Sequence, residues 1–225
     1  MYYNFDKTIV KTIDGEKLEY GFITGNEKIL FIKVGAGEDI HKYKDHYKRY
    51  VDMAVIAHNW FGVTVICASN PDVPHEDIDE EMIRMVASEQ DFEDFKLYLW
   101  GISDGAYHNL KLAKRFPETV KIIGVNTSFI TFSDLEDKLQ DLSHVKKILI
   151  YGSKDDDFDI VFPALRDKQD KYLKTIFIGG ADHSFSEMAE QLIYSIGFID
   201  EDTMDREVIS FGRYWSSKMI MKGNK

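Results

Sequence analysis

The sequence is poor in cysteine, proline and long apolar runs. It contains a single cysteine, Cys67, and only 4 prolines in 225 residues. One cysteine excludes an intramolecular disulfide and a multi-cysteine metal site. The N-terminal residues show no basic segment followed by an apolar run, and no apolar run reaches the roughly 18 residues of a membrane span. We therefore expect a cytoplasmic protein with no secretory signal and no membrane partner.

Positive charge is also scarce. The chain has 28 Lys and Arg against 39 Asp and Glu, a net charge of -11. An acidic chain binds phosphate backbones and anionic lipid surfaces poorly, so we expect neither nucleic acid nor membrane as a partner. The composition, with 44% hydrophobic and 13% aromatic residues, is that of a folded protein with a sizeable core. Because no repeat or Gly/Ser linker interrupts the chain, we predict a single domain over residues 1–225.

Short apolar runs alternate with longer amphipathic segments. The short runs have the composition of buried strands and cover residues 28–34, 63–69, 95–101, 120–126, 146–152 and 173–179. The segments with helical spacing of apolar residues include 39–60, 104–116 and 184–198. Near the N-terminus, Asp14 and Gly15 lie between two strand-like runs and predict an antiparallel hairpin. This alternation predicts an α/β fold, a mostly parallel central sheet with helices on both faces and ligands beyond the carboxyl ends of the strands.

A serine lies between two glycines where a strand-like run meets a helix-like one. Gly101, Ser103 and Gly105 form the pattern G-x-S-x-G, the nucleophile elbow, in which the chain turns sharply and presents the serine at a helix N-terminus. There the Asp104 amide can stabilise developing negative charge. The pattern arises by chance in about one chain of this length in twenty. The evidence for a nucleophile therefore comes mainly from its position between a strand and a helix. The alternative is an inert serine in a glycine-rich turn.

The stretch "GISDGAYHNLKLAKRFPETVKIIGVNTS" resembles the α/β-hydrolase family, and the resemblance extends from about Lys28 to Phe198. It implies an α/β-hydrolase fold and a serine hydrolase whose nucleophile is Ser103. It also implies that neither a cofactor nor a metal is needed. In this family the triad follows the order serine, acid, histidine.

For the acid, the resemblance indicates the segment "SKDDDFD" after the strand-like run 146–152. Asp155 matches the family's G-x-x-D pattern, with Asp157 as the alternative. A calcium loop fits poorly, because Ile160 and Arg166 occupy positions where glycine and glutamate are needed. A solvated acidic loop is the remaining interpretation.

For the base, "GADHSF" resembles the family's histidine loop and places His183 there. His183 would take the serine proton and return it to the leaving group. The oxyanion would be held by the amide of Asp104 and by that of Ala36, in the loop after 28–34. Many family members have His-Gly in this loop, whereas this chain has Val34-Gly35.

Only about twenty residues, 127–145, stand where the family carries a lid. They predict one small helix near 132–139 and an open, shallow cleft. Its expected walls are Phe129, Phe132, Phe158, Phe185 and Trp60, and the alternative for each of them is packing in the core. The acidic balance favours a neutral or cationic substrate.

The main hypothesis is a carboxylesterase acting on a small-molecule ester of a short acyl group. The alternatives are a peptidase, thioesterase or acyl transferase on the same triad, or a catalytically silent binding protein. Residues 200–225 lie beyond the resemblance and are expected to form an extra helix or a homodimer contact.

Overall fold

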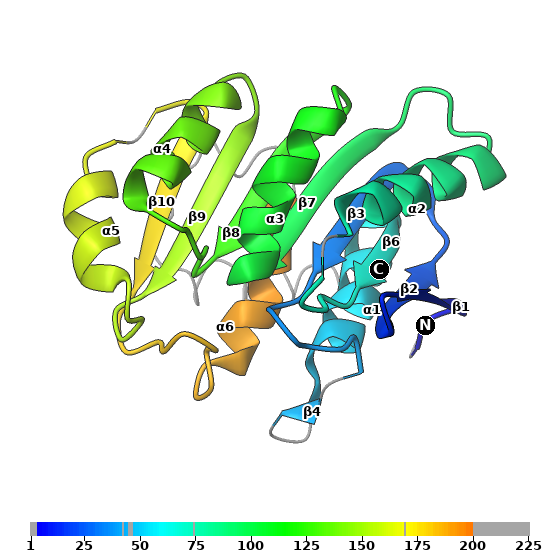
Figure 1. The fold of residues 1–225 in the computed structure, drawn as a ribbon, viewed down its shortest axis with the longest axis horizontal. Helices are drawn as coiled ribbons and strands as arrows, with labels where there is room; N and C mark the ends of the chain where they lie inside the picture. The colour runs from blue at the N-terminus through cyan, green and yellow to red at the C-terminus, as the bar shows by residue number, and fades with distance from the viewer. Residues whose placement is uncertain (1–3, 42, 45–46, 74, 169, 200–225) are drawn as a thin grey trace.

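The computed structural model describes residues 4–41, 43–44, 47–73, 75–168 and 170–199 (Figure 1). An eight-stranded sheet crosses this part of the chain in the order β1-β2-β6-β3-β7-β8-β9-β10. Within this sheet, β1 pairs antiparallel with β2 and β2 pairs antiparallel with β6, whereas all the other neighbouring strands pair parallel. Their bounds are β1 Lys7–Ile13, β2 Glu16–Ile23, β3 Asn26–Lys33, β6 Val63–Ala68, β7 Lys96–Ile102, β8 Thr119–Val125, β9 Lys146–Gly152 and β10 Leu173–Ile178. The mostly parallel sheet predicted from the sequence is confirmed.

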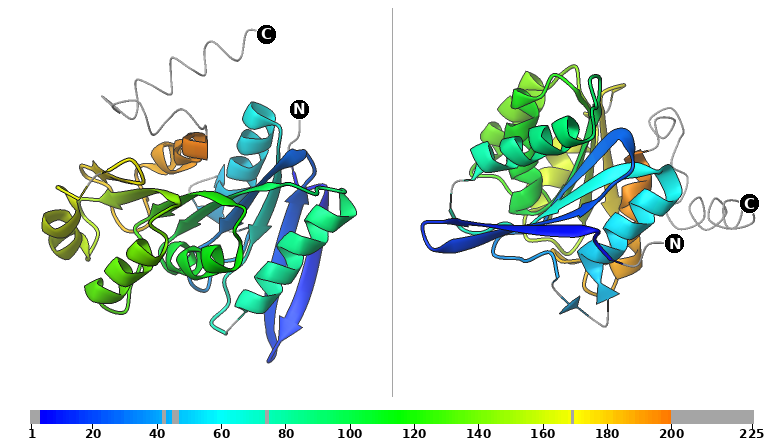
Figure 2. Two further views of the ribbon diagram at one scale, coloured as in Figure 1. Left: turned by 90° about the horizontal axis from the view of Figure 1, so that it is seen from above. Right: turned by 90° about the vertical axis from the view of Figure 1, so that its right-hand side faces the viewer.

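Helices cover both faces of the sheet (Figure 2). One face carries α1 (Arg49–Phe61), α6 (Ala189–Tyr194) and the 3-10 turn η2 (Ser195–Ile199). The other carries α2 (Glu76–Glu89), α3 (Asp104–Leu112) with η1 (Ala113–Arg115), α4 (Phe132–Asp141) and α5 (Phe158–Leu165). Successive residues of β3 alternate between the two cores, because a strand points its side chains to opposite faces in turn. Ile29 and Phe31 lie in the core under α2 and α3, whereas Leu30 and Ile32 lie in the core under α1.

Two predicted elements form as expected. The N-terminal hairpin turns at Asp14 (φ 51°) and Gly15 (φ 88°), the pair of positive φ angles that a tight two-residue hairpin requires. The strand-like runs all become strands, with bounds shifted by one or two residues.

Two predicted helices are shorter than expected. Within 39–60 the helix begins only at Arg49, and the two-residue strands β4 (Tyr43–Lys44) and β5 (Tyr47–Lys48) precede it. Within 184–198 the α-helix spans only Ala189–Tyr194, because Phe185 adopts φ 52°, a left-handed conformation that cannot continue a helix. Helix α2 had not been singled out from the sequence. No helix in the described ranges is both long and apolar enough to cross a membrane, and the prediction for residues 200–225 falls outside those ranges.

Candidate active site

Ser103 occupies a strained turn between the end of β7 and the start of α3. Its backbone has φ 55° and ψ -129°, a region that a residue with a side chain adopts only when its surroundings enforce it. A Cβ on Gly105 would lie 2.2 Å from the carbonyl oxygen of Val34, and one on Gly101 would lie 2.7 Å from the amide nitrogen of Ala106. Both glycines of the pattern are therefore required by close backbone packing, and the turn fixes the direction of the serine side chain.

The three residues predicted as a triad lie in hydrogen-bonding contact. His183 Nε2 is 2.8 Å from Ser103 Oγ, and His183 Nδ1 is 2.6 Å from Asp155 Oδ2. The Asp155 side chain is 1% exposed, whereas that of His183 is 45% exposed. The line thus begins at a buried carboxylate and ends at a hydroxyl that a small molecule can reach.

Asp155, and not Asp157, contacts the imidazole. Asp157 donates its amide to Asp155 Oδ1 at 2.9 Å and so helps to orient that carboxylate. Burial, and then the neighbouring charge of Asp155, raise the pKa of the Asp157 carboxyl. The hydrogen bond with Asp155 raises the pKa of His183 above its ordinary value of 6.5, although burial acts in the opposite direction.

Two polar residues after β8 support this line and were missed in the sequence. Asn126 donates its side-chain amide to the carbonyl oxygens of Asp182 (3.1 Å) and His183 (2.8 Å), and its Oδ1 accepts from the Gly152 amide at 2.8 Å. It therefore joins the histidine loop to the end of β9. Ser128 Oγ lies 3.1 Å from Ser103 Oγ. The available signal was their position, since polar residues that follow a buried strand at the carboxyl edge of a parallel sheet face the ligand side.

A pocket of about 220 Å³ opens beside Ser103. Its lining comprises Gly35, Ala36, Glu38, Arg49, Ile102, Ser103, His183 and Ser184. Of the two predicted oxyanion donors, Ala36 lines this pocket. Asp104 does not line it, but its amide is the first of α3 and so has no partner within the helix.

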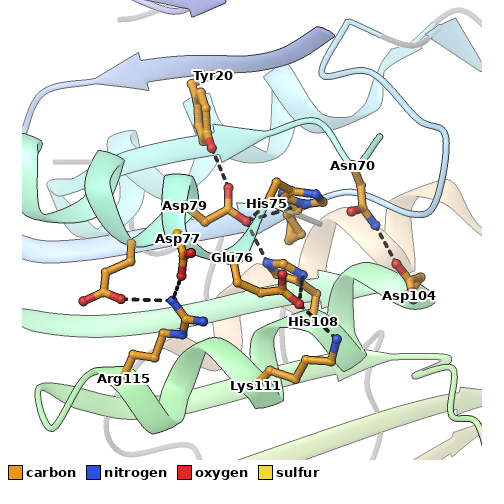
Figure 3. Close-up of polar contacts among 12 residues, drawn as sticks. Tyr20, Asn70, His75, Glu76, Asp77, Asp79, Asp104, His108, Lys111 and Arg115 are labelled. Atoms are coloured by element: carbon orange, nitrogen blue, oxygen red, sulfur yellow. Dashed lines mark hydrogen bonds and ion pairs between the residues drawn. The ribbon is translucent and has the colours of Figure 1, made fainter. Parts of the chain in front are cut away.

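Asn70 joins the segments of the two predicted oxyanion donors, a role that sequence reasoning missed. Its carbonyl accepts from the Gly37 amide at 2.8 Å and its amide donates to the Glu38 carbonyl at 3.1 Å. Its side chain donates to Asp104 Oδ2 at 3.1 Å (Figure 3). The loop after β3 and the start of α3 are thus held by one buried residue.

Solved structures with a similar fold include α/β hydrolases. An α/β serine hydrolase homologue from Coxiella burnetii is 15% identical, with a TM-score of 0.63 over 89% of this chain and 100% of that one. Est1E from Butyrivibrio proteoclasticus is 14% identical, with a TM-score of 0.61 over 88% and 99%. An α/β serine hydrolase without lid from Xanthomonas campestris is 18% identical, with a TM-score of 0.56 over 88% and 94%. This chain has the α/β-hydrolase fold.

At this level of identity the likeness concerns the fold alone. No family model and no curated protein matches the sequence significantly. The chemistry of this site therefore depends on its own residues and not on the likeness.

The region that carries a lid in many α/β hydrolases holds one short helix, as predicted. Helix α4 packs on α3, where the Tyr107 hydroxyl donates to Asp134 Oδ2 at 2.6 Å. None of the five aromatic side chains expected at the cleft lines the pocket beside Ser103, and each packs against other apolar side chains instead. Phe185 is 1% exposed in the core, Trp60 stacks on Tyr194, Phe158 stacks on Phe162, and Phe129 and Phe132 pack against the other core.

A buried ionic network lies beneath the loop after β3 (Figure 3). Asp79 Oδ2 is 2.8 Å from both Lys33 Nζ and His108 Nε2, and Asp79 Oδ1 accepts from the Tyr20 hydroxyl at 2.7 Å. Burial alone would raise the pKa of the Asp79 carboxyl, but Lys33 and His108 hold that pKa below its ordinary value. Since Lys33 ends β3 and His108 lies on α3, the network joins the two segments that frame the nucleophile.

Part of this network has the donor types of a metal site. His75, Asp79 and His108 each offer a ligand atom, all within 4.8 Å of one another, and two imidazoles with a carboxylate suit zinc. However, the Lys33 ammonium already supplies positive charge at the same carboxylate oxygen. The arrangement is therefore that of a buried ion pair flanked by two imidazoles.

Replacing Asp79 with asparagine should lower the free energy of unfolding by about 3–5 kcal/mol, because the Lys33 ammonium would stay buried without a counter-charge. Urea unfolding measures the change. Asp77→Asn on the same helix is the matched control: its side chain is 90% exposed, so its ion pair contributes about 0–1 kcal/mol. Adding Lys33→Met to Asp79→Asn should recover part of the loss. Equal stability of the Asp77 and Asp79 variants would contradict the prediction.

Proposed function

We propose that this protein is a serine hydrolase that cleaves an ester of a small acyl group through an acyl-enzyme intermediate. The observation that carries the proposal is the contact line from Asp155 through His183 to Ser103, buried at one end and open to a pocket at the other. The fold likeness supports it, since the similar structures include a serine hydrolase homologue and an esterase domain from Rhodothermus marinus.

The geometry supports a two-step reaction. His183 Nε2 takes the proton of Ser103 Oγ as this oxygen attacks the acyl carbonyl carbon. The Ala36 and Asp104 amides donate to the resulting oxyanion. As the intermediate collapses, the C–O bond to the alcohol breaks and His183 returns the proton to the leaving oxygen. Asp155 accepts from the Nδ1–H and stabilises the imidazolium.

Water completes the cycle. His183 takes a proton from a water molecule, whose oxygen attacks the acyl carbon. The bond between the acyl carbon and Ser103 Oγ then breaks, and His183 returns the proton to Oγ, which releases the acid. Every proton transfer in these steps uses a side chain of this chain, so the proposed cycle requires no metal or cofactor. Thioester, amide and acyl-transfer substrates use the same steps, and a substrate panel separates them from the proposed ester.

An active-site probe separates this proposal from a silent binding protein. A fluorophosphonate should label the protein, because an activated serine attacks phosphorus while an inert one does not. Peptide mapping by mass spectrometry should then find the label on Ser103 and not on Ser128, only 3.1 Å away. Absence of labelling, or labelling at another residue alone, would refute the proposal.

The raised pKa of His183 predicts the pH dependence of turnover. The imidazole must be neutral to accept the serine proton, so kcat/KM should rise with pH through the pKa of His183 in the free enzyme. Because the Asp155 contact raises that pKa, the midpoint should lie above the ordinary value of 6.5. Hydrolysis of p-nitrophenyl acetate in a pH-stat measures it. A midpoint below the ordinary histidine value would contradict the assignment.

A further inference from the structure

The pocket beside the nucleophile contains a buried guanidinium with no assigned role. Arg49 is the first residue of α1 and is only 5% exposed, and it lines the same pocket as Ser103 and His183. Its Nε and Nη2 atoms are buried and have no hydrogen-bond partner. The side chain therefore brings unused donors to the wall of the candidate active site.

Within the described ranges Arg49 forms no salt bridge with a carboxylate, and its Nε and Nη2 atoms have no hydrogen-bond partner. Its charge acts on the neighbouring Tyr50 hydroxyl, whose pKa it lowers against the larger effect of burial. The acidic neighbour in the pocket is Glu38, whose carboxylate already accepts from the Tyr50 hydroxyl. Burying an unpaired charge costs several kcal/mol, and unpaired buried donors add to that cost. Such a residue is stabilised when a ligand brings the missing negative charge.

We propose that the substrate carries a carboxylate in addition to its ester group, and that Arg49 binds this carboxylate. The inference rests on the proposed hydrolase function and narrows its substrate class. A guanidinium presents a planar fork of N–H donors that matches the two oxygens of a carboxylate. One guanidinium balances one negative charge. A phosphate dianion would leave an excess negative charge beside Glu38, so a carboxylate fits better.

The size of the pocket limits the substrate further. A volume of about 220 Å³ is below the roughly 300–1,000 Å³ of sites for drug-sized ligands. A short chain that ends in a carboxylate, such as a four-carbon diacid esterified at one end, fits this description. This substrate differs from the neutral or cationic one expected from the net charge of -11, because the proposal rests on the charge inside the pocket and not on that of the whole chain.

The test compares two esters of equal chain length. The wild type should have a higher kcat/KM for p-nitrophenyl hemisuccinate than for p-nitrophenyl butyrate, in which a methyl replaces the carboxylate. In Arg49→Gln the ratio of the two values should fall by about 10- to 100-fold, the worth of a charge-assisted hydrogen-bonded pair. Arg49→Lys keeps the charge but lacks the planar fork of donors, so its ratio should lie between those of the wild type and Arg49→Gln. Arg166→Gln, an arginine whose side chain is 54% exposed, should keep the wild-type ratio.

A second pair of substrates carries the carboxylate on the leaving alcohol and not on the acyl group. The pair is 4-acetoxybenzoate and its methyl ester, in which the carboxylate is masked. A ratio that falls for either pair supports the proposal, and unchanged ratios for both overturn it. Loss of thermal stability in Arg49→Gln with unchanged ratios also overturns it, since Arg49 would then act only in folding. If Arg49→Gln does not fold, the Arg49→Lys ratios decide. A wild type that hydrolyses none of the four esters refutes the hydrolase function itself, a result distinct from failure of the carboxylate inference.

Discussion

Replacing Ser103 with alanine should lower the turnover of p-nitrophenyl acetate by about a million-fold. The Ser103 hydroxyl is the proposed nucleophile, and without its oxygen the acyl-enzyme intermediate cannot form. When the nucleophile of such a triad is removed, the donors to the oxyanion and the binding pocket still give a small residual rate. The large loss is expected because serine and histidine act as one unit through their 2.8 Å contact.

The matched control is Ser128→Ala, since its hydroxyl lies 3.1 Å from that of Ser103. Removing one neutral hydrogen bond costs about 1 kcal/mol, so turnover should fall by no more than about tenfold. Melting temperatures of both variants show whether the fold is intact. If Ser103→Ala kept its turnover while Ser128→Ala lost it, the assignment of Ser103 as the nucleophile would be wrong and Ser128 would take its place.

Replacing Asp155 with asparagine should lower kcat by about ten-thousand-fold. Asparagine preserves the shape of the side chain, but its amide can donate to His183 Nδ1 and so favours the tautomer whose Nε2 cannot accept the serine proton. The change also removes the charge that stabilises imidazolium and the carboxylate hydrogen bond that chiefly raises the pKa of His183. The acid limb of the pH–rate profile should therefore move to lower pH.

Asp157→Asn provides the control two residues away. Asp157 raises the pKa of His183 only through its charge, and by less than the hydrogen bond and the charge of Asp155. Its replacement should move the acid limb slightly downward and change kcat by less than about tenfold, since the amide that donates to Asp155 is retained. The opposite ranking of the two variants would make Asp157 the acid.

The sequence by itself determined which runs become strands and that the sheet they form is mostly parallel. Runs such as 146–152 and 63–69 are short and apolar at most positions, which is the composition of a strand covered on both faces. Gly101 and Gly105 signalled the sharp turn because their missing side chains are a local requirement of backbone packing. The order of Ser103, Asp155 and His183 followed from resemblance, and the structure places all three in one hydrogen-bonded line.

Only the tertiary structure decided which residues surround that line. Asn70 and Arg49 have no local pattern that marks their roles, and Asn126 is marked only by its position after β8. Their partners lie in distant segments that meet only after the sheet forms. The same holds for the aromatic residues, which fill the two cores and leave the pocket to polar groups. Periodicity in a sequence records which face of an element is buried, and it carries no information on which distant element covers that face. The charge inside a pocket is set by that choice, so an acidic chain can hold a buried arginine beside its nucleophile.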